Sequence, residues 1–331
     1  YYNKKSEDII LSVPIANSSG FARIIRNSGV ISNKGIEVEL NLVPVKTKNF
    51  MWDLTTTFTK NKNLVEQLAD GVDAVFLGGF EGSSVRAVAG QPFGSIFGFG
   101  FYHDASGAVV IGNDGFPILD PTEKAFNSAL PNYTIGINNT FSFKGFDLSA
   151  LLDIKNGGYM WNGTRSALYY FGTHQETADL RNTMQTFAGN VAEYDAEGNV
   201  VLYDNDNNPN TPDIPKTTGK NGQSVLVDEN WLAFGNANGF FGNNTGDFIE
   251  STAWVRLREV TLGYTFTPSF LQKAKISSLR LYVSGRNQYL KTDYKGVDPE
   301  TSLIGADAAQ GLDYFNMPGT KSWTVGLNVG F

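Results

Sequence analysis

The closing stretch KSWTVGLNVGF, Lys321–Phe331, decides the fold of this chain. From Trp323 onward, apolar residues alternate with small or polar ones up to the last position, so a strand here has one apolar face and one polar face. In an outer-membrane barrel the apolar face meets lipid, the polar face lines a water-filled lumen, and the terminal strand pairs with neighbours on both sides. A strand of a soluble β-sandwich remains the alternative from this stretch alone.

The same alternation recurs along the chain. In the segment 36–42, four aliphatic residues alternate with Glu37, Glu39 and Asn41. Two carboxylates on one face fit a water-filled lumen, because a dry sandwich core could not hold them unpaired. A one-residue slip of the pattern near Arg258-Glu259 predicts a β-bulge. The alternation predicts about eight antiparallel strands, near residues 1–13, 33–46, 50–58, 133–143, 146–154, 252–266, 278–290 and 321–331.

The connections between these strands fall into two classes. Those at 46–49, 144–145 and 268–276 are short or moderate, and those at about 63–131, 159–251 and 291–319 are long. Short turns on one rim and long loops on the other are typical of outer-membrane barrels, whose long loops are extracellular. The apolar segment Phe93–Tyr102 is either part of an extracellular fold, which we favour, or half of a missed strand pair.

Composition excludes several classes of function. A net charge of −7 argues against a nucleic-acid partner, which requires a basic face. The two histidines, His103 and His174, lie in no metal or nucleophile motif, so we do not expect an enzyme. No apolar run is long enough for a transmembrane helix. The chain starts at Tyr1 inside an expected strand, and we expect it to be a piece of a longer protein.

Short motifs add a family resemblance. The chain resembles the C-terminal part of the SusC/RagA family, the TonB-dependent outer-membrane transporters of Bacteroidota, with motifs in the family's order over nearly its whole length. They are Asn27–Gly29, Asn33–Glu37, Trp52, Asn61–Asn63, Gly90–Pro92 with Gly94 and Gly98, Gly157-Gly158, Val255–Val260, Arg286–Gln288, Tyr294–Glu300 and Gly326–Phe331.

The resemblance implies an all-β, transmembrane antiparallel β-barrel of roughly 22 strands with a plug in its lumen. Residues 1–331 would then supply about the last eight strands, and the plug and the TonB-contacting segment would lie outside this chain. It further implies an importer of oligosaccharides or oligopeptides, in contact with outer-membrane lipid. Its partners would be TonB and a SusD-like surface lipoprotein acting as a lid, with two such pairs forming a dimer. A soluble β-rich glycan-binding module and a passive porin are the alternatives.

Two groups of side chains are candidate site residues. Aromatic rings in the longest loop could contact ligand or lid, or pack within the loop; they are Tyr159, Trp161, Tyr169, Tyr170 and Trp231. Expected lumen-facing charges could guide an anionic substrate or brace the plug, and the arginines could instead pair with carboxylates such as Asp147 and Asp153. These charges are Glu37, Glu39, Arg256, Arg280 and Arg286.

An oxygen-rich run beginning at Asp204 is the one candidate cation site. Asp204 and Asp206 could ligate calcium, but the run lacks the glycine and the closing glutamate of an EF-hand loop. We therefore favour a flexible polar loop tip and expect no cofactor.

Overall fold

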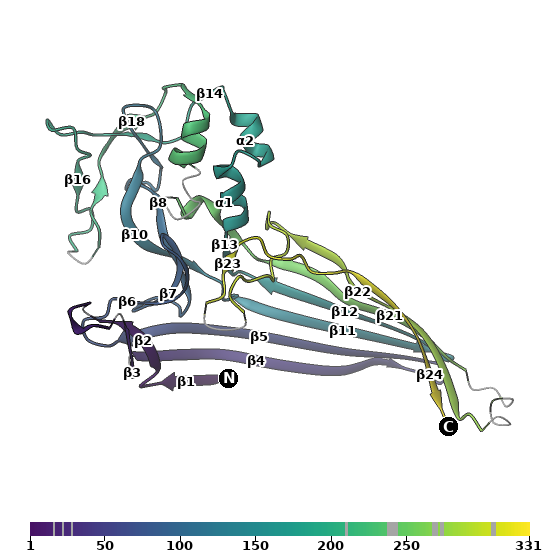
Figure 1. Ribbon diagram of the computed structural model, residues 1–331. Coiled ribbons are helices and arrows are strands. Elements are labelled where there is room, and N and C mark those ends of the chain that lie inside the picture. The colour runs from purple at the N-terminus through teal and green to yellow at the C-terminus, as the bar shows by residue number, and fades with distance from the viewer. Residues whose placement is uncertain are drawn as a thin grey trace.

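The computed structural model describes residues 1–15, 17–21, 23–27, 29–208, 211–236, 244–266, 271, 275–305 and 309–331. Eight antiparallel strands form one long sheet, which we call the wall, in the order β1-β4-β5-β11-β12-β21-β22-β24. Figure 1 shows the wall as a curved sheet with a folded mass at one end. The wall strands are β1 (Tyr2–Ser6), β4 (Gly29–Lys46), β5 (Phe50–Leu68), β11 (Tyr133–Phe143), β12 (Phe146–Asn156), β21 (Trp254–Phe266), β22 (Ser278–Thr292) and β24 (Ser322–Gly330).

The register of the wall follows from the alternation in its strands. Leu148 of β12 lies opposite Phe141 of β11 on one side and Leu262 of β21 on the other. The row continues through Val283 of β22 to Val325 of β24. Because neighbouring strands keep their apolar residues in phase, one face of the wall is apolar across its width.

The predicted β-bulge is confirmed. The pairing of β21 with β12 shifts between Leu257 and Glu259, which leaves Arg258 as the extra residue. The pairing of β21 with β22 shifts at the same place, where two residues of β22 oppose Arg258. The two-residue turn Lys144-Gly145 has positive φ at both positions (47° and 91°), the backbone of a tight hairpin turn. Most of the predicted turn at 268–276 lies outside the described residues.

Two wall strands differ in length from the prediction. The first ends at Ser6 rather than Val13, because Asp8 adopts φ +55° and the chain turns out of the wall. β5 continues to Leu68, past the expected start of the loop at residue 63. Its polar extension is paired, since Asn63 donates from Nδ2 to Asn33 Oδ1 at 2.8 Å.

The folded mass, which we call the crown, comprises the described residues of the segments 69–132, 157–253 and 293–321. A four-stranded sheet in the order β10-β8-β7-β6 fills much of the first segment, so the segment Phe93–Tyr102 lies in the crown and not in the wall. These strands are β6 (Ala74–Phe80), β7 (Ser83–Val88), β8 (Ser95–Phe101) and β10 (Leu119–Ser128). The hairpin of β2 (Ile10–Pro14) and β3 (Arg23–Asn27), with the 3-10 turn η1 (Asn17–Ser19), lies beside β6 (Figure 1).

The remaining crown elements are short. At the base of the second segment, β13 (Tyr159–Asn162) pairs with β20 (Ile249–Ser251) and, in parallel, with β23 (Leu312–Asp313). The others are β9 (Val110–Ile111), α1 (Gly163–Tyr170), α2 (Gln175–Leu180), β14 (Thr183–Gln185), β15 (Asn190–Ala192), β16 (Leu202–Tyr203), β17 (Ile214–Pro215), β18 (Thr217–Lys220), β19 (Val225–Val227), η2 (Trp231–Asn236) and η4 (Gly246–Phe248).

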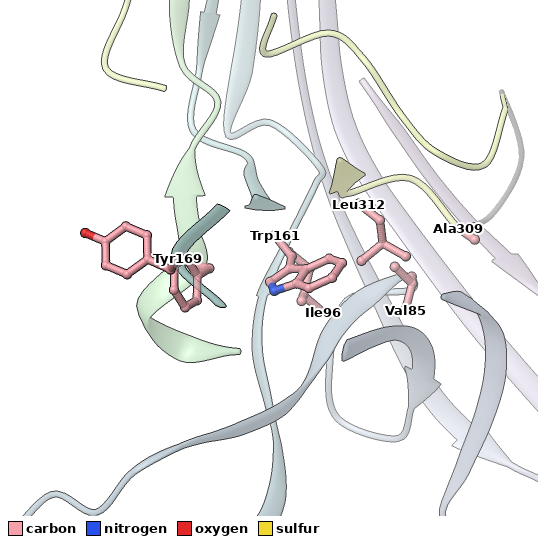
Figure 2. Packing of buried hydrophobic residues seen from close by; sticks show 7 residues of the cluster. Val85, Ile96, Trp161, Tyr169, Ala309 and Leu312 are labelled. Atoms are coloured by element: carbon pink, nitrogen blue, oxygen red, sulfur yellow. The ribbon is translucent and has the colours of Figure 1, made fainter. Parts of the chain in front are cut away.

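The core of the crown joins segments that are distant in the sequence. Figure 2 shows Trp161 close to Ile96 of β8, with Leu312 of β23 and Val85 of β7 on one side of its ring. Tyr169 of α1 belongs to the same buried cluster. Among the described residues, no helix is both long and apolar enough to cross a membrane.

Candidate functional site

The apolar face of the wall has no second layer of the described chain over it. Ile36 is 45% exposed, Leu148 40%, Leu281 45% and Leu327 59%. An apolar surface this continuous requires an apolar surrounding, because water would oppose its exposure.

Aromatic side chains gather on this face at the end with the short turns. Phe50, Phe143, Phe146 and Tyr264 lie side by side in the register of four neighbouring strands. The ring centroids of Phe146 and Tyr264 are 4.4 Å apart, and those of Tyr264 and Phe266 are 4.6 Å apart. A row of rings at this level corresponds to the aromatic girdle of a membrane barrel.

The opposite face of the wall is polar. One row across five strands consists of hydroxyl side chains, Thr140, Ser149, Thr261, Ser284 and Thr324. Thr261 Oγ1 donates to Ser284 Oγ at 2.8 Å. Thr261 and Ser284 are themselves buried, but hydroxyl groups both donate and accept, so this face is suited to polar partners.

An ion pair crosses β21 on the polar face. Arg280 Nε donates to Asp147 Oδ1 at 3.1 Å and Arg280 Nη2 to Asp147 Oδ2 at 2.5 Å. Gly263 lies between them, and a Cβ there would come within 2.6 Å of Arg280 Nη2. A side chain at position 263 would therefore separate the pair.

A second ion network fastens the crown to the wall. Arg256, whose side chain is 4% exposed, donates to both carboxylate oxygens of Asp298, at 2.6 and 3.3 Å. Arg258 donates to Asp153 Oδ2 at 2.7 and 2.8 Å and also pairs with Glu300. Arginines therefore pair with Asp147 and Asp153, which is one of the two alternatives that the sequence left open.

The other expected lumen charges lie apart from these networks. Arg286 Nε pairs with Glu259 at 3.2 Å on an exposed part of the polar face. Glu37 lies opposite Thr59, and Glu39 accepts a hydrogen bond from Asn41 Nδ2 at 2.8 Å. Their roles in guiding a substrate or bracing a plug stay predictions.

The five candidate aromatic residues do not form one site. Trp161 and Tyr169 are buried in the crown core, which differs from the expectation of ligand or lid contact, because both rings pack within the chain. Trp231 packs against Phe116 and Phe187, with ring centroids 5.3 and 4.7 Å away.

The last two aromatic residues line separate cavities. Tyr170 lines a cavity of about 300 Å³ with Arg181 and Leu232. Tyr159 lines another, of about 390 Å³, at the junction of wall and crown.

The crown holds a charged cluster that was not predicted from the sequence. Arg165 Nη2 pairs with Glu176 Oε2 at 2.6 Å, and Lys295 Nζ pairs with Glu176 Oε1 at 3.1 Å. Burial raises the pKa of Glu176, but hydrogen bonds from Arg165 and Lys295 outweigh it and lower that pKa. Its sequence signal was Lys295, which lies within the family motif 294–300.

A buried tyrosine continues this cluster. Tyr294 donates from its hydroxyl to Asp313 Oδ2 at 2.6 Å. Burial, together with this hydrogen bond, raises the pKa of Tyr294 far above its usual range. The hydroxyl therefore stays protonated and acts as a structural donor.

The described residues bring together no metal site or catalytic arrangement that we recognise. Asp204 Oδ1 and Asp206 Oδ1 accept backbone N–H groups at 3.0 Å, and no three His, Cys, Asp or Glu side chains gather in the described part of the chain. His174 Nδ1 accepts the Glu176 amide at 3.2 Å and so begins α2.

Comparison with known proteins identifies several that are similar to this chain. The chain is similar over its full length to TonB-dependent receptor P3 of Formosa agariphila, at 27% identity and over 32% of that protein. It is similar to TonB-dependent receptor SusC of Bacteroides thetaiotaomicron at 24% identity and over 29% of its length. No family model matches the chain. The chain thus spans about a third of the curated relatives it matches.

Solved structures show the same fold. The structure of the RagAB peptide transporter matches 99% of this chain and 32% of its own, with a TM-score of 0.65 at 21% identity. A RagAB peptide importer in the closed-closed state gives a TM-score of 0.62 at 20% identity. These likenesses confirm the resemblance to SusC-type receptors, the barrel-type all-β fold and the outer-membrane location. The relatives are named as receptors and transporters and not as enzymes.

Proposed function

We propose that this chain is the C-terminal wall section of a TonB-energised nutrient importer of the outer membrane. The observation that carries the proposal is the two-sided wall, whose uncovered apolar face includes Ile36 and Leu327 and whose other face carries hydroxyls and ion pairs. The apolar face would contact lipid, and the polar face would line a water-filled lumen that holds the plug. The plug and TonB-contacting segment belong to a part of the protein outside residues 1–331.

The crown is the side on which cargo and lid would meet the importer. We propose a SusD-like lipoprotein as the lid, oligosaccharides or oligopeptides as the cargo, and a dimer of such transporter–lipoprotein pairs. The description of RagAB as a peptide transporter supports an oligopeptide cargo, and the description of SusC as a TonB-dependent receptor supports energised uptake.

Two other functions fit the molecule less well. A soluble glycan-binding module would cover Leu148 and Leu281 with a second sheet, and both are at least 40% exposed. Passive diffusion through a porin does not require a crown, and this chain has one with its own buried core around Trp161 and Leu312.

The proposal is tested on the full-length parent protein. We expect it to fractionate with the outer membrane, to need detergent for extraction, and to change its gel mobility on heating. Uptake of its cargo should stop when TonB is deleted, while cargo binding to the cell surface persists. A monodisperse protein in plain buffer, or uptake that continues without TonB, would contradict the proposal.

A further inference from the structure

Three lysines lie on the apolar face of the wall, at the end nearest the crown. Lys34 of β4 lies directly opposite Lys62 of β5, and Lys60 of β5 lies opposite Ile36. The pairing of the two strands runs through this region without a register shift, so the three lysines share the face of Ile36. All three are exposed. We call Lys34, Lys60 and Lys62 the lysine cluster.

The lysine cluster lies where the apolar band of the wall ends. On β4 the apolar residues of this face run from Ile36 to Val45, which is about ten residues, the length that a tilted strand needs to cross the hydrocarbon. Lys34 is the next residue of this face beyond the band. At the edge of the band the rings of Phe58 and Tyr133 lie with their centroids 5.9 Å apart, and such rings mark the level of the membrane interface. The ammonium groups therefore lie at the level of the lipid head groups.

The charges of the lysine cluster are not compensated within the described part of the chain, where no carboxylate pairs with its ammonium groups and no group accepts a hydrogen bond from them. The neighbouring Lys5 differs, because it forms ion pairs with Glu7 at 3.0 Å and with Glu66 at 3.7 Å. Like charges directly opposite each other on paired strands repel and destabilise a sheet. An anion from outside the chain would remove this repulsion.

The anion at this place belongs to the surrounding lipid. The crown contains the long connections, which are extracellular in outer-membrane barrels, so the lysine cluster faces the outer leaflet. We propose that it binds the phosphate groups of a phosphorylated glycolipid of that leaflet, the lipid A part of lipopolysaccharide.

Both parts of such a lipid fit this surface. A lysine ammonium has three rotatable N–H donors for phosphate oxygens, and its aliphatic stem can lie along apolar surface while its charge reaches the head groups. The acyl chains would pack on Ile36 and Val38, which are 45% and 50% exposed just inside the band. The inference concerns the lipid around the wall and does not depend on the cargo.

Calorimetric titration of the full-length protein in a non-ionic detergent tests the proposal. The probes are bisphosphorylated lipid A, the same lipid A without its phosphates, phosphatidylglycerol and inorganic phosphate, and we expect the first to bind most tightly. Combining Lys34→Gln, Lys60→Gln and Lys62→Gln should weaken its binding about a hundredfold, because each lysine near an anionic lipid surface contributes about fivefold. Arginine at the same three positions keeps the charge and should keep the binding.

The matched control removes three exposed lysines at the opposite end of the wall, by Lys46→Gln, Lys48→Gln and Lys144→Gln together, and changes the net charge equally. It should bind lipid A as the wild type does, and all variants should keep the wild-type gel shift on heating. Wild-type binding should also weaken as salt is added, which tests the electrostatic contact without any substitution.

Three results would overturn the inference. They are equal binding of phosphorylated lipid A by the glutamine variant and the wild type, binding of any other probe as tightly as phosphorylated lipid A, and wild-type binding that salt does not weaken. The proposed import function would survive each of them if wild-type cells still take up cargo in a TonB-dependent way.

Discussion

Arg256 and Asp298 lie 42 residues apart in the sequence and form a buried, doubly hydrogen-bonded ion pair between wall and crown. Both belong to family motifs, Val255–Val260 and Tyr294–Glu300. The two motifs are therefore the two halves of one junction. A planar guanidinium that meets a carboxylate at two points fixes orientation as well as distance.

Breaking this pair should destabilise the junction. Asp298→Asn leaves the buried Arg256 with Glu300, 3.2 Å away, as its remaining charged partner. We expect a loss of about 3 kcal/mol, the lower end of the range for a buried ion pair that loses one member. Thermal unfolding of the detergent-solubilised protein measures the loss. The control is Glu259→Gln, which breaks the exposed pair with Arg286 and should cost about 0–1 kcal/mol. Equal losses for the two variants would contradict this account.

Gly263→Ala should separate Arg280 from Asp147. The added Cβ lies within 2.8 Å of both partners, so the pair must open or β21 must shift. We expect a lower unfolding temperature than for the wild type, measured by circular dichroism. Gly222→Ala is the matched control, because nothing lies within 4 Å of its Cβ position. A shift no larger than that of the control would count against a role for the open backbone at Gly263.

The start of α2 should loosen as the pH falls. Burial, followed by the nearby Arg165 and Lys295 charges, lowers the pKa of His174 below the ordinary histidine value of 6.5. The unfolded segment therefore takes up the proton first, so the stability contributed by neutral His174 is complete above about pH 6.5 and declines below it. The pKa of Glu176 is also lowered, so the stability that its carboxylate contributes declines below pH 4.5, the ordinary pKa of a glutamate.

Hydrogen exchange of the α2 amides, corrected for intrinsic rates, measures this change between pH 7.5 and 5.5. His174→Asn keeps a side-chain acceptor at the start of the helix but does not titrate. We expect this variant to lose the pH dependence in that range. The same dependence in both proteins would rule out His174 as the titrating group.

A charge on the apolar face should be harmful, while one on the polar face should be tolerated. Leu148→Arg faces lipid, and we expect it to cost about 2–4 kcal/mol near the middle of the bilayer. Ser149→Arg, one residue further, points to the opposite face and should cost less. Denaturant unfolding in lipid vesicles compares the two. The reverse order would mean that the faces have been assigned the wrong way round.

Periodicity was a good guide to the wall and a poor guide to the crown. The wall strands are long, and half of each faces an apolar surrounding, so the sequence alternates clearly enough to show even the bulge at Arg258. The polar end of β5 escaped prediction because Asn61 and Asn63 pair with Asn33 through side-chain amides rather than through an apolar pattern.

The strands of the crown could not be predicted from the sequence for a different reason. Many of its strands have only two to four residues, as in β9 and β23, which is too short for a period to emerge. Its core depends on contacts between distant segments, such as Trp161 with Leu312. Exposure of an aromatic ring could not be read from composition, so Tyr159 could not be distinguished from the buried Trp161 before the fold was known.

The pairing of β13 with β20 closes the 159–251 excursion at its base, where Tyr159 lies opposite Ser251. The short pairing of β13 with β20 thus brings the strands β12 and β21 together, independently of the conformation of the residues between β13 and β20. Insertions and deletions within the excursion leave their register untouched. Evolution can therefore change the length and sequence of the crown without altering the strand pairing of the wall.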